Sequence, residues 1–218
     1  MYKNLHSCVK VENMATDWFA VERGVRQGDN LAPVLFAIFI NDLALDINNL
    51  NLGIQMCDNS KLSVLMYADD IIILSETEND MQNMLDTLHS WSEKWQLKMN
   101  IDKTKIMHCR KASMKPTDKT FNIGHQTIDL CKSYRYLGFE ICETVEFTKG
   151  VKLLHEAGGR ALGAMISKHF SIKGLSFPVY EKLYYNTVVP VADYASEIWG
   201  FKKYDFADKL QSRAERTF

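Results

Sequence analysis

The sequence predicts an α+β fold in which short antiparallel strands come first and a run of helices follows. Two apolar segments, residues 62–66 and 71–74, flank one acidic tetrapeptide and are typical of paired strands. Apolar side chains then recur at helical spacing between residues 76 and 98, and from residue 147 onward the pattern is helical. We therefore expect a mainly antiparallel sheet backed by helices, followed by a helical region.

Composition restricts the class of protein. With 218 residues, 46% of them hydrophobic and 11% aromatic, the chain should form one good core or two small domains. Its formal net charge of -1 means that any nucleic-acid-binding surface must be local. The five cysteines are widely spaced without a Cys-x-x-Cys pair, which indicates neither a zinc site nor a disulfide framework. Because no signal peptide or membrane-spanning stretch is found, we expect an intracellular protein of the cytoplasm or nucleus.

The first hairpin and a later connector are expected from short patterns. Strands at 7–11 and 18–21 should pair through a turn at 13–17. Residues 48–60 are polar and are interpreted as a connector that leads to the apolar segments at 62–74.

A loop and a buried helix should lie between these two segments. Two glycines and Pro33 mark a loop at 24–33. Asp29 and Asn30 are typical N-cap residues, and Pro33 suits a first helical turn. The helix at 33–48 is apolar nearly all round in its first half, so we expect that half to be buried.

The tetrapeptide Tyr67-Ala68-Asp69-Asp70 should form the tip of the hairpin at 62–74. Adjacent carboxylates repel each other unless a cation lies between them, and hard oxygen ligands suit Mg²⁺. A solvated Asp-Asp turn is the simpler alternative. The apolar flanks on both sides favour a metal-binding tip.

The helix at 76–98 carries an apolar stripe. Its tryptophans could form a platform for stacking bases, but a core face packed on a sheet is the more common role of such a stripe. The stripe consists of Met81, Met84, Leu85, Leu88, Trp91 and Trp95.

Several short strands, and a segment with more basic than acidic residues, are expected before the helical region. Basic residues outnumber acidic ones between Lys94 and Lys119, where a solvated loop is the alternative to a phosphate-binding surface. A glycine within a strand often marks a close backbone approach, and Gly138 holds such a position. The expected strands are 106–109, a hairpin of 121–124 with 126–128, and a single strand at 133–141.

Three helices should form the rest of the chain, with a domain boundary near Thr144. Gly158-Gly159 and Pro190 are candidate kinks. The expected helices are 148–170, 178–199 and 206–218.

Four segments, taken in order, resemble the motifs of reverse transcriptases of the non-LTR (LINE-type) retrotransposon family. Together they are far more specific than a lone YxDD. The helices beyond Thr144, including Tyr194-Ala195-Ser196-Glu197-Ile198-Trp199-Gly200, resemble the thumb. The four segments are Gly24-Val25-Arg26-Gln27-Gly28-Asp29 (motif B), Tyr67-Ala68-Asp69-Asp70 (motif C), residues 97–105 with Asn100, Lys103 and Thr104 (motif D), and Tyr136-Leu137-Gly138 (motif E, the primer grip).

The resemblance implies a right-hand polymerase palm in residues 1–144, followed by a helical thumb and the start of the connection in 145–218. The implied reaction is a two-metal nucleotidyl transfer with Mg²⁺ or Mn²⁺, using an RNA template, a DNA primer and deoxynucleoside triphosphates. No membrane partner and no oligomeric state follow from it. The implied roles are metal ligands for Asp69 and Asp70, a general acid for Lys103, nucleotide or template contacts for Gln27, Gly28, Tyr67 and Ala68, and the primer grip for Tyr136, Leu137 and Gly138.

The sequence departs from the family pattern in two ways. Asn30 stands where the family usually has proline, and Ala32 where it often has serine, which alters only a turn and a cap. More importantly, the motif A aspartate and the fingers lie upstream of the segments found here, so we expect this chain to be inactive alone. A catalytically dead remnant with at most residual nucleic-acid binding is the alternative function. An unrelated structural protein with a chance hairpin is disfavoured by the order of the motifs.

Overall fold

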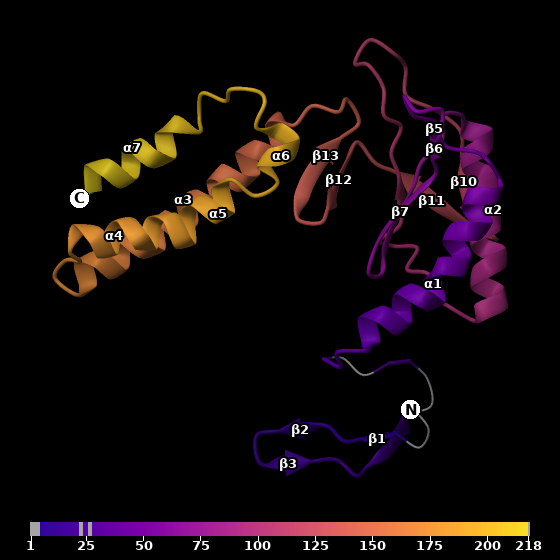
Figure 1. Ribbon diagram of the computed structural model, residues 1–218, viewed down its shortest axis with the longest axis horizontal. Helices are drawn as coiled ribbons and strands as arrows, with labels where there is room; N and C mark the ends of the chain where they lie inside the picture. Colours follow the sequence, from indigo (N-terminus) through magenta and orange to yellow (C-terminus); the bar gives the residue numbers. More distant parts are fainter. Residues whose placement is uncertain (1–4, 22–23, 26–27, 218) are drawn as a thin grey trace. The chain divides into compact units, whose positions relative to one another are not determined.

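The computed structural model describes residues 5–21, 24–25 and 28–217. These residues form two compact units (Figure 1). The first unit contains the chain up to residue 99 together with 121–127, and the second contains residues 100–120 and the chain from 128 onward.

The first unit begins with the expected hairpin. Strand β1 (Leu5–Ser7) pairs antiparallel with β4 (Phe19–Val21), and β2 (Lys10–Val11) pairs with β3 (Met14–Ala15). The predicted turn at 13–17 is wrong, because β3 occupies part of it and the chain reverses between β2 and β3.

Helix α1 (Ala32–Asn49) was predicted with nearly correct bounds but with the wrong cap. Its N-cap is Leu31, without a side-chain bond, because the Asp29 carboxylate accepts a hydrogen bond from the Leu31 backbone at 2.9 Å in the preceding turn. Pro33 lies in the first turn, as predicted.

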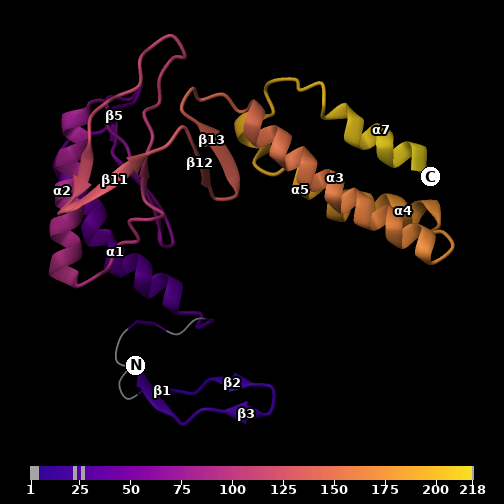
Figure 2. The same cartoon turned by 180° about the vertical axis from the view of Figure 1, so that it is seen from behind.

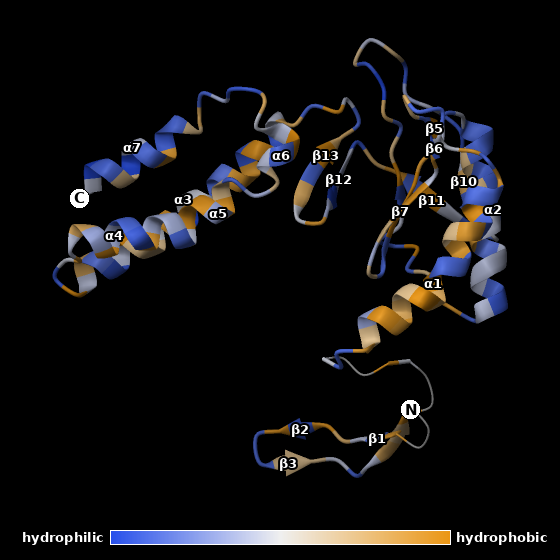
Figure 3. Ribbon diagram, viewed as in Figure 1, coloured by the Kyte–Doolittle hydropathy of each residue, from blue (hydrophilic) through white to orange (hydrophobic). Residues whose placement is uncertain are grey.

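The expected burial of the first half of α1 is also wrong. Val34 and Ile38 are 56% and 66% exposed, while the later Ile40, Leu43 and Ile47 are buried. Figure 3 shows this apolar first half in orange. Burial follows contact with helix α2 (Glu78–Trp95), which α1 packs against, rather than the local composition.

Helix α2 confirms the interpretation of its stripe as a core face. The Thr77 hydroxyl accepts a hydrogen bond from the Asp80 amide at 3.1 Å and caps the helix. Trp91 is only 4% exposed, and its ring lies edge-on to Phe39 with centroids 5.7 Å apart. Trp95, at the end of the stripe, is 38% exposed.

The connector predicted at 48–60 contains a short strand. Strand β5 (Ile54–Gln55) pairs antiparallel with β6 (Lys61–Leu62). The turn between them is closed by Asp58, which accepts hydrogen bonds from the amide and the hydroxyl of Ser60. The Ser60 hydroxyl holds the pKa of Asp58 below its ordinary value.

Strands β7 (Val64–Tyr67) and β8 (Asp70–Ile73) form the predicted antiparallel hairpin, and β7 contacts α1. The hairpin is less buried than expected, since Leu65 is 43% exposed.

Strand β10 (Phe121–Ile123) packs on α2. The Gln82 side-chain amide donates a hydrogen bond to the Asn122 carbonyl at 2.9 Å and accepts one from the Asn122 backbone N–H at 3.1 Å. Together with the start of β11 (Gln126–Leu130), β10 makes the predicted second hairpin.

In the second unit, β9 (Lys105–Ile106) is shorter than predicted and pairs parallel with the end of β11. The single strand expected at 133–141 is wrong. Strands β12 (Ser133–Tyr136) and β13 (Phe139–Cys142) form an antiparallel hairpin instead. The chain reverses because Leu137 and Gly138 both have positive φ, +45° and +86°.

The helical region follows as expected, but its second helix is broken. Pro190 cannot donate a backbone hydrogen bond, and a π-helical turn precedes it. Ala195, at φ +55°, is the N-cap of the short helix that begins at Ser196. The elements are α3 (Thr148–Ser171), α4 (Phe177–Leu183), the π-turn η1 (Tyr184–Val188), α5 (Val189–Ala192), α6 (Ser196–Trp199) and α7 (Asp208–Thr217).

Two apolar clusters hold the second unit together. Figure 2 shows α5 and α7 alongside the long helix α3, with which both are in contact. One cluster joins β13 to α3 and α6, and the other joins α3 to α4, η1 and α7. They consist of Phe139, Val151, Leu154, Trp199 and Tyr204, and of Leu162, Met165, Tyr180, Val188 and Ala214.

The predicted α+β class with mainly antiparallel pairing is confirmed. Among the described strands, however, the pairings form separate small sheets rather than one continuous sheet. Within the part of the chain that the structure describes, no helix is both long and apolar enough to cross a membrane.

Candidate functional site

The acidic pair lies at the tip of the β7–β8 hairpin. Tyr67 pairs with Asp70, so Ala68 and Asp69 alone make the turn. Ala68 has φ +51°, in the left-handed region that residues with a side chain rarely adopt. The fold therefore places Asp69 in a tight, strained turn, of the kind that clusters at functional sites, and Asp70 directly after it.

The base of this hairpin is anchored more firmly than its tip. The Ser63 hydroxyl, on a side chain only 3% exposed, donates to the backbone carbonyl of Leu52. The Leu74 amide donates to the Ser63 carbonyl at 2.8 Å. Beside them, the Glu76 carboxylate accepts a hydrogen bond from the Gln55 amide at 2.9 Å. These bonds hold the base of the hairpin in place within the first unit.

Both carboxylates of the tip are available to a ligand. Asp69 and Asp70 are exposed, and so is Tyr67, at 64%. Carboxylate oxygens are the donors that Mg²⁺ prefers, so the pair fits a divalent ion as two of its ligands. Over the described residues, no group of three or more His, Cys, Asp or Glu side chains is placed to hold one metal ion.

Motif B is described only in part. Gln27 lies outside the described residues. Gly28 is exposed at φ +85°, with no atom within 4 Å of the place where a Cβ would stand. Asp29 forms the turn that leads into α1.

Lys103 lies in the second unit, in a turn organised by Asn100. The Lys103 amide donates to the Asn100 side chain at 3.2 Å, and the Thr104 hydroxyl donates to the Asn100 carbonyl at 2.9 Å. The Lys103 carbonyl accepts a 3.1 Å bond from the Tyr134 hydroxyl, and the residue is exposed. This turn therefore presents the lysine to solvent while its backbone is fixed.

The predicted primer-grip residues form the tip of the β12–β13 hairpin. Tyr136 ends β12 opposite Phe139, and Leu137 with Gly138 makes the turn. The base of this hairpin is tied to α3, because the Lys149 ammonium bonds Glu140 at 2.6 Å and Ser133 at 2.7 Å. The Lys149 ammonium holds the pKa of Glu140 below its usual range.

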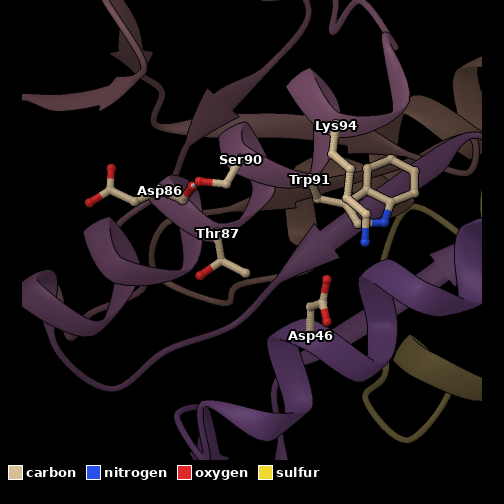
Figure 4. A pocket seen from close by; sticks show the side chains of 6 residues that line it. All are labelled: Asp46, Asp86, Thr87, Ser90, Trp91 and Lys94. Atoms are coloured by element: carbon tan, nitrogen blue, oxygen red, sulfur yellow. Dashed lines mark hydrogen bonds between the residues drawn. The ribbon is translucent and has the colours of Figure 1, made fainter.

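A groove of about 320 Å³ lies between α1 and α2 and contains none of the predicted site residues (Figure 4). The indole nitrogen of Trp91 is buried there without a hydrogen-bond partner among the described residues. The groove is lined by Asp46, Asp86, Thr87, Ser90, Trp91 and Lys94.

Sequence reasoning missed two tyrosines that hold the predicted site residues. Tyr134 bonds the backbone of Lys103, and Tyr194 bonds the backbone of Leu137 at 2.6 Å. The second pair is 57 residues apart in sequence, and no local pattern connects the two partners. The sequence marked that region only through the resemblance of the 194–200 segment to the thumb.

Comparison with known proteins gives one consistent result. A family model described as reverse transcriptase (RNA-dependent DNA polymerase) matches residues 2–141. The chain is 25% identical over 218 residues to the probable RNA-directed DNA polymerase from transposon BS of Drosophila melanogaster, covering 96% of this chain and 24% of that protein. It is 19% identical over 216 residues to the RNA-directed DNA polymerase from mobile element jockey of the same organism, covering 96% and 23%.

A shorter match involves a second kind of element. The chain is 29% identical over 151 residues to a retrovirus-related Pol polyprotein from the type-1 retrotransposable element R2 of Nasonia vitripennis, covering 63% of this chain and 14% of that protein. The chain thus spans about a quarter or less of the length of these relatives.

Proposed function

Because the chain belongs to the reverse transcriptase family, we propose that it forms the palm, in residues 1–144, and the helical thumb, in residues 145–218, of a retrotransposon RNA-directed DNA polymerase. The observation that carries this proposal is the exposed Asp69-Asp70 pair at the strained tip of an anchored hairpin. The mainly antiparallel pairings up to Cys142 and the helices from Thr148 support this division. The two compact units divide the chain differently, since residues 100–120 and 128–144 belong to the same unit as these helices.

Asp69 and Asp70 would hold a divalent cation, Mg²⁺ or Mn²⁺. Two like charges side by side repel, and a cation between them removes that repulsion. When bound, such ions supply activation of the primer 3′-hydroxyl and neutralisation of charge on the triphosphate. Tyr67 and Ala68 would border the incoming nucleotide, where the small alanine side chain leaves room for the sugar.

The remaining predicted residues would bind and orient the nucleic acid. Gln27 and Gly28 would contact the template and the nucleotide. Lys103, exposed on a fixed turn, would protonate the leaving pyrophosphate. The Leu137-Gly138 turn would meet the primer strand through its backbone, which positions a strand without reading its sequence. The substrates would be an RNA template, a DNA primer and deoxynucleoside triphosphates.

The 218-residue chain is expected not to extend a primer by itself. Two carboxylates from one hairpin reach an ion from one side only, whereas Mg²⁺ requires near-octahedral geometry. An error of about 1 Å at such a centre can lower the rate by about a hundredfold. Binding without extension is the expected behaviour.

A cation titration tests the proposal. We expect Mn²⁺, followed by electron paramagnetic resonance, to bind the purified chain weakly and to lose this site in Asp69→Asn. Asp42→Asn, which removes the same charge from an exposed position on α1, is the matched control and should bind as the wild type does. Equal binding by both variants would refute the metal site.

A primer-extension assay completes the test. The chain is incubated with an RNA template, a labelled DNA primer, Mg²⁺ and deoxynucleotides. We expect no elongation. Elongation above background that Asp69→Ala abolishes would show that the chain is a complete polymerase.

A further inference from the structure

The Tyr194 side chain contacts the tip of the β12–β13 hairpin. Its hydroxyl donates a hydrogen bond of 2.6 Å to the Leu137 carbonyl, and its ring atom Cε1 lies 3.4 Å from the place where a Cβ on Gly138 would stand. The tyrosine therefore bonds one residue of this two-residue turn, and its ring lies beside the other. It comes from the segment between α5 and α6.

The turn is stabilised by such a contact because its backbone is strained. Leu137 at φ +45° is a branched residue in the left-handed region, which disfavours residues with a side chain. Leu137 is 36% exposed, so its side chain is not fixed by complete burial. The bond from Tyr194 fixes the carbonyl of the residue under strain.

Tyr194 is itself held from the core of the same unit. The indole nitrogen of Trp199 donates to the Tyr194 carbonyl at 2.9 Å, and Trp199 is only 6% exposed. Trp199 belongs to the apolar cluster that also contains Phe139, the residue directly after the turn. A continuous path of contacts therefore runs from the core through Tyr194 to the hairpin tip.

From this arrangement we infer that Tyr194 is a positioning residue for the primer strand, acting through the backbone of the Leu137-Gly138 turn. The inference rests on the proposed function, because it assigns to that turn the contact with the primer. Tyr194 holds the turn in one orientation before nucleic acid binds, so that the primer end meets a fixed backbone. Without the hydroxyl, the turn samples several orientations, and the primer end is placed less often.

The first experiment measures the restraint without nucleic acid. Tyr194→Phe removes only the hydroxyl, from a side chain that is 47% exposed, so the fold is expected to persist. In the full 218-residue chain we expect amide hydrogen exchange in peptides covering 133–142 to be about fivefold faster in this variant, the effect of losing one hydrogen bond. Tyr185→Phe, from an exposed side chain on η1, is the matched control and should leave that exchange unchanged.

The second experiment measures the placement of the primer. A DNA primer ending in 4-thiothymidine is annealed to an RNA template and photo-crosslinked to the chain, and the yield on the 133–142 peptide is determined. We expect Tyr194→Phe to reduce this yield severalfold and to leave the crosslinks of a probe placed well upstream in the primer unchanged. A merely structural role would reduce both yields together.

Each outcome decides a separate point. Unchanged exchange in Tyr194→Phe would overturn the restraint of the turn. Faster exchange with an unchanged terminal crosslink would overturn the role in placing the primer. A wild-type chain that binds no RNA–DNA hybrid would refute the proposed function and with it the primer half of the inference, while exchange would still decide whether Tyr194 holds the turn.

Discussion

Replacing Gly150 with alanine should weaken the contact between α3 and the β12–β13 hairpin. Gly150 lies in the first turn of α3, is buried, and faces β13. A Cβ added there would stand 2.6 Å from the Glu140 carbonyl oxygen and 2.8 Å from the Phe139 ring. Because the nearest atom belongs to the backbone, it cannot swing aside, and the helix and the strand must move apart.

The expected size of the effect follows from two opposing contributions. Overpacking of a core costs about 1–3 kcal/mol, and this contact adjoins Val151, which is fully buried. Alanine in place of glycine stabilises a helix by about 0.5–1 kcal/mol. The net loss should be about 1–2 kcal/mol, which lowers the Tm of a chain of this size by about 2–8 °C.

The same helix offers a matched control. Gly163 lies in the middle of α3, with no atom within 4 Å of the position of an added Cβ. Gly163→Ala should therefore keep only the gain in helix stability, and raise Tm by about 1–4 °C. Differential scanning calorimetry of the two variants beside the wild type measures both shifts. Shifts of the same sign in both variants would show that the packing of α3 on β13 has been misjudged.

Two further predictions concern bonds that link a helix to a strand. Gln82→Ala should lower the free energy of unfolding in urea by about 1–2 kcal/mol, because it removes both bonds to the Asn122 backbone; an unchanged urea midpoint would contradict this. The Lys149 ammonium lowers the pKa of Glu140 in the folded state. The ion pair therefore stabilises the fold fully above the ordinary carboxyl pKa of about 4.3. This stabilisation is lost as the pH falls through the lower pKa of the folded state. Wild-type Tm should therefore fall more steeply than that of Glu140→Gln between about pH 5 and pH 3, and parallel curves would refute the link.

The elements that could be predicted from the sequence are those whose stability is local. Helix α2 has a capping threonine, an apolar stripe and no interrupting glycine or proline, and its bounds are close to those expected. The β7–β8 hairpin follows from two apolar strands around a polar pair. The position of Asp69 and Asp70 at its tip could be predicted for the same reason.

The expectations that failed depend on contacts between distant segments or on unusual backbone conformations. The first half of α1 is apolar, yet its burial depends on which helix lies beside it. Leucine seldom occurs at turn positions, so nothing at Leu137 predicts that the chain reverses there. Residues 133–141 therefore resemble a single strand. The left-handed Ala195 similarly interrupts a segment whose composition is typical of a continuous helix.

The two predicted contact points for substrate, Ala68 and Leu137, have the same local geometry. Each lies in a two-residue turn between paired strands, and each has a positive φ although it carries a side chain. Such a conformation costs about 1–2 kcal/mol per residue, and the flanking pairs and anchoring bonds must offset it. Glycine would relieve this strain but would leave the turn free to adopt other conformations. Ser63 anchors the base of one hairpin, and Tyr194 bonds the turn of the other directly. A non-glycine residue in such a turn lowers stability but favours a single backbone orientation. That is the property that a surface needs if it is to hold a metal ion or a primer end in place before the reaction begins.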